Sequence, residues 1–476
     1  MPNPGGQRGA ALLTVLTVLV ALGVVVSFIV DRVRGDVRPW VLESENAKAL
    51  YAAESGIAYQ LYLERFSDSA EPSFGEPLPS DSGGADEAFG EKLGDASGMA
   101  PKGPRAPTDT FKFRMDSGLT TPRVRVDRTR AFLDMLSTGR YRNAEVTLSA
   151  RFGKALNDSV FGPGLTLDND QPVEAFAADR VQGTMRIRTP APGMATLPWA
   201  QGFSLGSYTA EFTDRKYLAL EAQLQKRFAD PEAEKGNGHF TPRERPKFGR
   251  RGYVTHVLGE VDLINEKDET WVLKGPGRIY SEGPIRVKGH IRLENIQLLS
   301  GRDITFEDSV SGEGNSAFAR GSVFFHNNCR LGIEAVAGKD IVLRDRAQTT
   351  LESVLISVGG KQAAKGADSL NAIRVVNDAV ARGFLIAGGG NGRVVMATDK
   401  NRIEGVVMAS AVWLAGEVRG PVLTRKLLCE GSNARNCFGP GRIFRNRLPS
   451  GFVQPLQLGP QDRRQYEFKL MAWRRL

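Results

Sequence analysis

Three related phrases occur in the second half of the chain: GRIYSEGPIRVKG (residues 277–289), QLLSGRDITFEDS (297–309) and AVAGKDIVLRDRA (335–347). Each starts with apolar residues, passes through a small residue and a glycine, and continues as a strand in which apolar and polar residues alternate. The shared glycines are Gly283, Gly301 and Gly338, so the second gap is about twice the first. This spacing is typical of a coil that repeats every 18–20 residues or so, roughly the shortest period of repeat proteins.

Less exact copies of this pattern follow between residues 355 and 420, in LISVGG, FLIAGGG and VVMASAVWLAGEVRG. Short strands joined by glycine turns at a fixed period are what a parallel β-helix needs, because each coil buries one inward row of side chains against the next coil. A β-sandwich also has short alternating strands, but it does not explain a repeated phrase. We therefore predict a parallel β-helix, or β-solenoid-like domain, over residues 251–430.

An apolar stretch near the N-terminus predicts a membrane anchor. Ala10–Val30 contains no charged residue over 21 positions, about the length of a helix that crosses a bilayer core. A secretory signal peptide is the alternative, but the run is long for one, and no small-x-small cleavage site follows it directly. We expect a retained anchor with the β-rich domain outside. The positive-inside rule, which compares Arg8 with Arg32, Arg34 and Arg38, favours the opposite orientation.

A second helical pattern follows the anchor. Apolar residues recur there at spacings of three, four and seven, among them Leu50, Tyr51 and Ile57, which predicts an amphipathic helix. Pro39 predicts a break between the two helices, because proline lacks a backbone donor. Glu54 falls inside the apolar stripe. Its carboxylate either has a partner in the following domain or lies in solvent at the edge of the stripe.

The stretches QRGAALLTVLTVLVALGVVV and AKALYAAESGIAYQL together resemble the N-terminus of type IV pilin-related proteins, specifically PilX-type minor pilins and K-type pseudopilins of type II secretion. The phrase AAESGI is the more specific part. In that family a prepilin peptidase cuts after a glycine that precedes the apolar helix, so the resemblance implies cleavage between Gly9 and Ala10. Major pilins carry a glutamate at the fifth mature position, where this chain has Thr14. PilX-type and K-type members also tend to lack this glutamate.

This resemblance implies an assembly element as well as an anchor. The expected partners are other pilin or pseudopilin subunits, the inner-membrane assembly platform, prepilin peptidase and the lipid bilayer. The expected location is the inner membrane, crossed once, with the C-terminal domain in the periplasm or on the cell surface and associated with a filament. The residues expected to take part in helix packing are Leu12, Leu13, Thr14, Leu50, Tyr51, Glu54 and Ile57.

Between the predicted N-terminal helix and the predicted solenoid, the composition of the sequence changes twice. Residues 67–109 are rich in Ser, Gly, Pro and acidic residues, which predicts a flexible linker. The stretch PRVRVDRTRAFLDMLSTGRYRNAEVTLSARF predicts short strands with a turn near Thr138–Gly139, and part of it resembles the strand pair that follows the helix in PilX-type proteins. Short strands such as Leu165–Leu167 come next, and then a helix that Thr213 caps and that ends at Phe228.

The predicted fold is mainly β with a long N-terminal α-helix. We divide it into a leader peptide (1–9), a transmembrane and amphipathic pilin-like helix (10–66), a flexible linker (67–109), pilin-like strands (110–153), strands and one helix that lead into the solenoid (154–250), the β-solenoid (251–430) and a basic C-terminal tail (431–476).

Residues with catalytic potential show no catalytic pattern. The acids Asp303, Asp308, Asp340 and Asp345 recur at equivalent places of the repeated phrases, as solvated turn residues do, rather than as the carboxylate pair of a glycosidase. The four histidines lack metal-ligand spacing, and GGGNG at 388–392 lacks the features of a phosphate-binding loop. We therefore expect no enzyme activity, no cofactor and no metal.

The cysteines and the net charge indicate which cross-links and which charged partners to expect. Cys429 and Cys437 are close enough in sequence to form a disulfide in an oxidising compartment, and three free thiols, with Cys329, are the alternative. The net charge of +9 arises from 63 basic and 54 acidic residues that are mostly interspersed. Only Arg442–Arg475 is locally basic, and no arginine-aromatic motif of a nucleic-acid module occurs, so we expect no nucleic-acid partner.

Two classes of function are consistent with this sequence. The first is a non-enzymatic minor pilin-like subunit of a type IV pilus or type II secretion pseudopilus, which displays a large β-rich head at the filament tip. The second is a membrane-anchored β-helix adhesin or enzyme that acts on surface polysaccharide, with the first helix as a plain anchor. The two differ in whether the N-terminal helix is processed and packs against other subunits.

Overall fold

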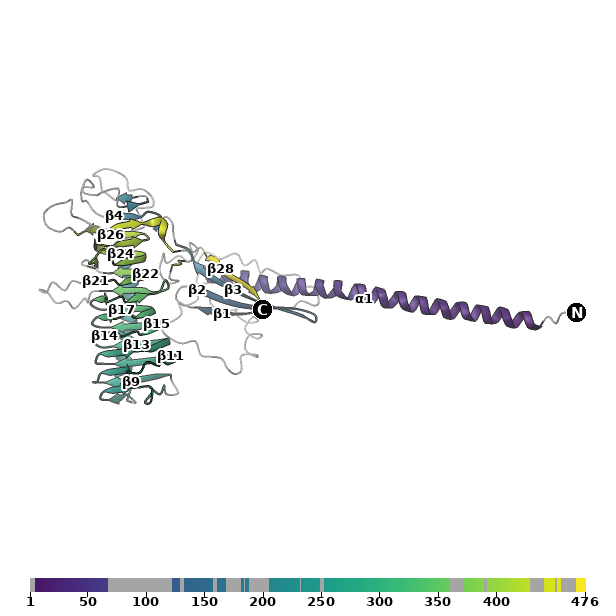
Figure 1. The fold of residues 1–476 in the computed structure, drawn as a ribbon, viewed down its shortest axis with the longest axis horizontal. Helices are drawn as coiled ribbons and strands as arrows, with labels where there is room; N and C mark the ends of the chain where they lie inside the picture. Colours follow the sequence, from purple (N-terminus) through teal and green to yellow (C-terminus); the bar gives the residue numbers. More distant parts are fainter. Residues whose placement is uncertain are drawn as a thin grey trace, which may run out of the picture.

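The computed structural model describes residues 5–66, 122–128, 132–156, 161–167, 181–183, 185–187, 205–231, 233–248, 252–358, 372–388, 392–428, 441–449, 452–454 and 468–476. An N-terminal helix packs on a small antiparallel sheet, and a parallel β-solenoid of about eight turns follows (Figure 1). The predicted parallel β-helix is confirmed. The β-sandwich alternative is wrong, because the strand pairings described within the 24-stranded solenoid sheet are parallel.

The first helix, α1 (Gly5–Phe66), is continuous over 62 residues. The break predicted at Pro39 is wrong: a proline removes one backbone donor and can kink a helix, but helical backbone continues on both sides of this one. Within α1, side chains are described for residues 18–20, 22–27, 30 and 41–64, and among the described residues no helix is long and apolar enough to cross a membrane. Much of the predicted span Ala10–Val30 lies outside those residues and stays a prediction.

The small sheet combines three early strands with the last strand of the chain. Its antiparallel strands lie in the order β1 (Arg123–Arg128), β2 (Phe132–Tyr141), β3 (Ala144–Lys154) and β28 (Phe468–Arg475). In β28, Phe468 lies opposite Lys154 of β3. This differs from the predicted basic tail over 431–476: an exposed edge strand carries charged residues, and its sequence therefore looks like a tail. The solenoid is inserted between β3 and β28.

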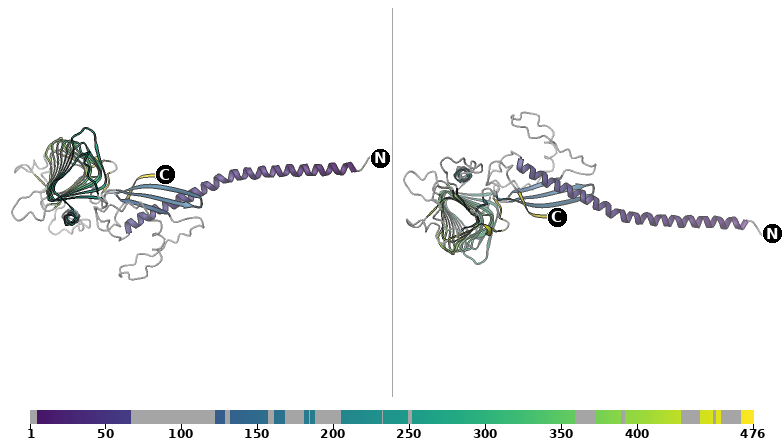
Figure 2. Two further views of the ribbon diagram at one scale, coloured as in Figure 1. Left: turned by 90° about the horizontal axis from the view of Figure 1, so that it is seen from below. Right: turned by 90° about the horizontal axis from the view of Figure 1, so that it is seen from above.

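Seen along its axis, the solenoid has a triangular cross-section, and its strands form three faces (Figure 2). Face A consists of β8 (Gly238–Phe240), β10 (Val261–Asn265), β12 (Ile285–Gly289), β14 (Ile304–Glu307), β16 (Val323–Phe325), β18 (Ile341–Leu343), β21 (Ala372–Val375) and β23 (Arg393–Met396). Six long strands begin on face C and continue onto face B: β11 (Trp271–Ser281), β13 (Ile291–Ser300), β15 (Ser311–Ala319), β17 (Arg330–Ala337), β22 (Val380–Ala387) and β24 (Arg402–Leu414).

Shorter strands complete the other two faces. Face B adds β9 (Tyr253–Val257), β20 (Val354–Ser357), β26 (Val422–Leu427), β4 (Leu165–Leu167) and β6 (Met185–Ile187). Face C adds β19 (Gln348–Thr349), β25 (Glu417–Arg419), β27 (Arg442–Phe444) and β5 (Val181–Gln182). Beside β9 lies β7 (Glu234–Lys235), and the short 3-10 helix η4 (Arg445–Arg447) follows β27.

Columns of inward-facing residues form the core, one residue per turn. One column on face A consists of fully buried residues, the last of which comes from the end of β24, which continues onto this face: Ile285, Ile304, Val323, Ile341, Ile373, Val394 and Val412. In a neighbouring column, Phe306 stacks on Phe325 with ring centroids 5.2 Å apart. Burial of each such side chain contributes about 1.5–3 kcal/mol, so stability accumulates turn by turn.

Stacked glycines turn the long strands from face C to face B. Gly383, Gly405 and Gly420 lie in register on successive turns with φ of 106°, 153° and 147°, which other residues rarely adopt. A Cβ atom on Gly405 would lie 1.9 Å from the carbonyl oxygen of Gly383. The high glycine content of this half therefore reflects bends at which one turn contacts the next.

The recurring aspartates are turn residues, as predicted. Asp308 and Asp345 occupy equivalent left-handed turn positions, and Asn327 lies between them and donates its side-chain amide to Asp308 Oδ1 at 2.8 Å. At another corner, Asp303 Oδ1 accepts a hydrogen bond from the backbone of Ser322 at 2.7 Å. These carboxylates stabilise the stacking of neighbouring turns, and each hydrogen-bonds the turn that follows.

The solenoid is closed by a segment that precedes it in the sequence. β4 pairs with β26 through Leu165 and Val422, so this early strand lies beyond the turns formed late in the chain. The chain then returns along face B through α3 (Leu205–Phe228), which contacts strands from β9 to β26 (Figure 2). The helix predicted to end at Phe228 is confirmed, but the cap predicted at Thr213 is wrong, because α3 begins at Leu205 and Thr213 lies inside it. The strands predicted to lead into the solenoid are part of its stack.

Face B is apolar on its outer side, and α3 covers it. Leu220 and Leu224 of α3 are buried against outward side chains that include Tyr280 and Phe318. The same interface contains an ion pair between Lys216 of α3 and Glu334 of β17, whose side chains are only 7% and 2% exposed. A buried ion pair fixes the position of α3, because neither charge tolerates burial without the other.

Candidate functional site

The side of α1 that packs on its sheet combines small alanines with larger aliphatic residues. Ala49, Ala53 and Ile57 are almost fully buried, and they face a core that includes Met135 and Leu148 of the sheet. Their spacing of four residues places them on one side of the helix. The short side chains allow the helix backbone to lie close to the strands.

Two glycines mark where the backbones approach most closely. A Cβ atom on Gly139 of β2 would lie 2.2 Å from the carbonyl oxygen of Ala49 and 2.4 Å from the amide nitrogen of Ala53. A Cβ atom on Gly56 of α1 would lie 2.6 Å from the hydroxyl of Ser137. The phrases AAESG in the helix and STG in the strand are therefore two halves of one contact. The turn predicted near Thr138–Gly139 is wrong, because β2 continues to Tyr141.

Polar contacts fix one end of this interface. Lys48 donates to the hydroxyl of Tyr141 at 3.0 Å and also lies 4.5 Å from the centre of its ring. Arg142 lies 3.5 Å from the carboxylate of Glu45, whose side chain is only 11% exposed. Arg142 has a left-handed φ of 51° in the hairpin between β2 and β3, and this turn places its guanidinium beside the helix. The contacts fix the helix in register along the hairpin.

The four predicted helix-packing residues with described side chains lie in four different environments. Ile57 is buried against the sheet, Leu50 packs at its edge, and Glu54 is half-buried. Tyr51 is 66% exposed and faces away from the sheet. Sequence reasoning missed Ala49, Ala52, Ala53 and Gly56 because it weighted bulky residues. The repeat of small residues at helical spacing was the signal that could have identified them.

The side of α1 that faces away from the sheet carries large aromatic residues. Tyr51, Tyr59 and Tyr62 are 66%, 61% and 49% exposed. They lie within about three turns of helix and form one outward surface, which begins about 30 Å along the helix from the end of the predicted membrane segment at Val30. We call these three residues the tyrosine surface. Exposed aromatic residues in a group are typical of contact surfaces.

Several predicted site residues lie outside the described side chains. The backbone of Gly9, Ala10, Leu12, Leu13 and Thr14 is helical, but their side chains are outside the described set. The predicted disulfide partners Cys429 and Cys437 are outside it altogether. Processing at Gly9 and the disulfide remain predictions. Cys329, which the structure does describe, is a free and buried thiol, and burial raises its pKa to about 12.

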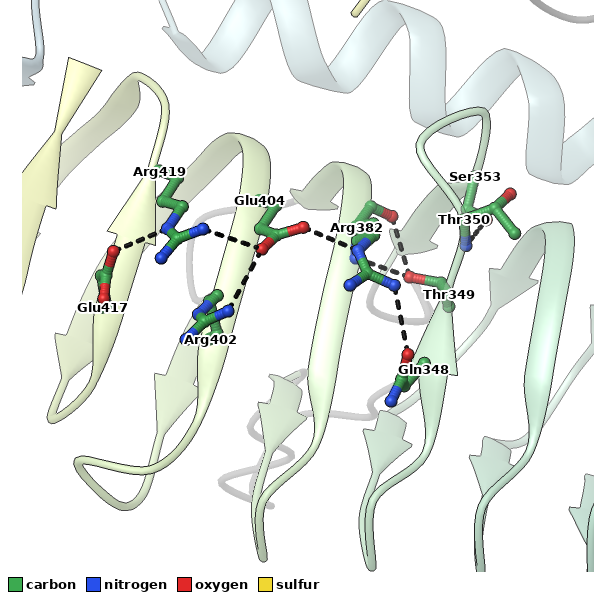
Figure 3. A network of polar contacts seen from close by, with 9 residues as sticks. All are labelled: Gln348, Thr349, Thr350, Ser353, Arg382, Arg402, Glu404, Glu417 and Arg419. Carbon is green, nitrogen blue, oxygen red and sulfur yellow. Dashed lines mark hydrogen bonds and ion pairs between the residues drawn. The ribbon is translucent and has the colours of Figure 1, made fainter. Parts of the chain in front are cut away.

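A second polar arrangement lies on the outer side of face C, near the last turns of the solenoid (Figure 3). Arg382 donates to Glu404 at 2.6 Å, and Arg419 lies 3.4 Å from the same carboxylate. Arg419 also donates to Glu417 at 2.6 Å. We call this set the arginine face; it comprises Arg382, Arg402, Glu404, Glu417, Arg419, Arg442 and Arg447.

Positive charge dominates the electrostatics of the arginine face. Glu404 is 8% exposed, and Arg402 approaches it to 3.5 Å as a third cation. At Glu417, burial acts to raise the carboxyl pKa, but the hydrogen bond from Arg419 and the charges of nearby arginines lower that pKa below its usual range. Five arginines therefore lie around two carboxylates, and the lowered pKa of Glu417 keeps that side chain ionised at neutral pH.

His326 and Cys329 are buried side chains of types that can bind metal ions. Among the described residues, no three His, Cys, Asp or Glu side chains are placed to hold a metal ion. His326 contacts Arg344, and burial together with that positive charge lowers the pKa of the imidazole, so the ring is neutral near pH 7. Cys329 donates its thiol hydrogen to the carbonyl of His326 at 2.8 Å, a structural contact.

The geometry thus presents two surfaces with functional potential, one on α1 and one on the solenoid. The tyrosine surface belongs to a module in which a helix is fixed on a four-stranded sheet. The arginine face belongs to the inserted solenoid. Compared with protein families, with curated proteins and with solved structures, this chain has no match.

Proposed function

We propose that the protein is a non-enzymatic pilin-like subunit of a type IV pilus or type II secretion pseudopilus, which assembles through α1 and displays the solenoid as a large head. The observation that carries the proposal is the division of α1 into two surfaces. Small residues such as Ala53 fit its own sheet, and the tyrosine surface faces outward. A plain anchor needs neither a tailored contact with the sheet nor an exposed aromatic surface beyond the bilayer.

The topology also supports an assembly role. β28 returns to pair with β3, so both ends of the chain belong to the helix-sheet module, and the solenoid is an insertion in it. Such an arrangement joins the head to the module through two connections instead of one. The head is then carried at a fixed place beside the module. This suits a subunit that displays a domain on a polymer.

The shape of the molecule favours a terminal position in the filament. The long axis of the solenoid lies across the direction of α1, so the head is much wider than the module that carries it (Figure 1). Subunits stacked closely along a filament would bring neighbouring heads into the same space. We therefore place this subunit at the tip or at the initiation of assembly, in keeping with Thr14 at the position where major pilins have glutamate.

Cross-linking from the tyrosine surface tests the proposal. With the photo-reactive residue benzoylphenylalanine in place of Tyr51 or Tyr59, irradiation of membranes should join this chain to a second polypeptide that itself has a short leader and an apolar N-terminal helix. Both positions are more than half exposed, so the probe should not disturb the fold. Mass spectrometry identifies the adduct.

A matched control is the same probe at Leu258, which is 76% exposed but lies on the solenoid. It should give no adduct with a pilin-like subunit. The proposal fails if Tyr51 and Tyr59 capture only lipid, or if Leu258 captures the same subunit equally well.

A further inference from the structure

The arginine face has positions that are fixed before any ligand binds. Arg382 is held by Glu404 and also lies 3.2 Å from the amide oxygen of Gln348, while its backbone amide donates to Thr349 at 2.7 Å. These contacts come from neighbouring turns of the solenoid. Long arginine side chains normally lose much conformational freedom on binding, and here part of that loss has already occurred in folding.

The face carries more positive charge than its two carboxylates neutralise. Arg402 and Arg447 have side chains that are 40% and 51% exposed, and each reaches its glutamate only at 3.5 Å. Arg442 is exposed on β27, and among the described residues it has no carboxylate partner. Three arginines are therefore open to solvent beside a carboxylate network that other arginines already satisfy.

The arrangement repeats along the solenoid axis. Arg402, Glu417 and Arg442 lie in register on successive turns of face C. Parallel strands are about 4.8 Å apart and Glu417 lies between the two arginines, so the positive groups lie about two strand spacings apart along the axis. A linear polymer with repeated charged groups matches such an array better than a compact small molecule does.

The chemistry of the face selects among polymers. Guanidinium groups bind carboxylates and sulfates in bidentate fashion, and the carboxylate of Glu417, whose side chain is 26% exposed, can accept a hydrogen bond from a hydroxyl group. An acidic polysaccharide offers both kinds of group. The phosphate backbone of duplex DNA offers acceptors alone, at one charge per roughly 1.7 Å of axis, and it would meet the ionised carboxylate of Glu417.

We infer that the arginine face binds an acidic polysaccharide, with the exposed arginines at its anionic groups and Glu417 at its hydroxyls. This inference concerns the solenoid and does not rest on assembly through α1. Loss of binding would leave the cross-linking result unchanged, and loss of cross-linking would leave binding unchanged.

The test compares the binding of defined polymers to the full chain in detergent. Polygalacturonate supplies carboxylates, heparin supplies sulfates, and dextran is the neutral control. The triple variant Arg402→Gln/Arg442→Gln/Arg447→Gln removes the exposed charges and keeps the contacts of Arg382 and Arg419 with Glu404. Biolayer interferometry at about 0.15 M salt should show binding of one or both acidic polymers and none of dextran, with affinity for the acidic polymer at least about tenfold lower in the variant.

The matched control is Arg286→Gln/Arg292→Gln/Arg330→Gln, which removes the same number of charges from earlier turns of the solenoid. It should bind like the unaltered chain. The inference is overturned if the two triple variants lose affinity equally, or if neither acidic polymer binds the unaltered chain. Tighter binding of duplex DNA or of anionic lipid vesicles than of either polysaccharide would also overturn it.

Discussion

We expect the substitution Gly139→Val to separate α1 from its sheet. The Cβ atom alone would lie 2.2 Å from the carbonyl oxygen of Ala49, and backbone on both sides leaves no room to adjust. Overpacking of a tight interface costs about 1–3 kcal/mol and occasionally more, and we expect at least about 3 kcal/mol here because backbone rather than a flexible side chain is displaced. Amide hydrogen exchange in residues 45–57 of the full chain should accelerate by roughly a hundred-fold.

The neighbouring substitution Arg140→Ala is the control for this experiment. Arg140 projects from the opposite side of β2, where its side chain is 51% exposed and pairs with Glu145 at 2.6 Å. Loss of an exposed ion pair costs at most about 1 kcal/mol, so exchange in α1 should change little. Unaltered exchange in Gly139→Val would show that the helix does not rest on β2 at this point.

We expect the substitution Glu334→Gln to weaken the packing of α3 on face B. The substitution leaves the Lys216 ammonium buried without its counter-charge, and breaking one partner of a buried pair costs about 3–5 kcal/mol. Local opening of α3 should become at least about a hundred-fold more frequent. Trypsin cleavage after Lys226 or Arg227, in the last turn of α3, reports this opening, because the protease needs an unfolded segment.

The double variant Lys216→Met/Glu334→Leu separates loss of the charge pair from loss of packing. Replacing both members of a buried pair by apolar residues is often neutral or stabilising, so cleavage in α3 should return to the original rate or below it. If the double variant is cleaved as fast as Glu334→Gln, then shape rather than unpaired charge accounts for the effect.

The solenoid could be predicted because each of its turns is stabilised by the same kinds of local contact. Each turn places apolar residues inward at the same phase, so Ile304 and Ile341 fall at equivalent points of related phrases and occupy one core column. The glycine and aspartate of each phrase mark its corners. Asp303 and Asp340 therefore have the same role as acceptors for the backbone of the following turn.

The closing turn of the solenoid could not be predicted in this way. Leu165 pairs with Val422, more than 250 residues later in the chain, and its strand has only three residues. A strand this short gives no periodic signal, and its partner depends on the return path through α3. The edge strand β28 escaped prediction for a related reason, since Lys469 and Arg474 are exposed and resemble residues of a tail.

The helix-sheet contact shows the limit of hydrophobic periodicity. That reasoning favours large residues such as Tyr51, yet the buried side of α1 has Ala49 and Ala53, and the aromatic residues face outward. Close packing rather than apolar area decides which side of this helix meets the sheet, and it requires glycine at Gly139 of the strand. The side of α1 that meets the sheet is evident only when the helix and strand sequences are considered together.

The N-terminus of the membrane-bound protein tests the assembly account most directly. N-terminal sequencing of the protein from membranes of cells that contain prepilin peptidase should give AALLTVLTVL, starting at Ala10, and Gly9→Leu should leave residues 1–9 attached. An intact Met1 in the unaltered chain, or a cut after Val30, would contradict the account and leave α1 as a plain anchor or a removed signal.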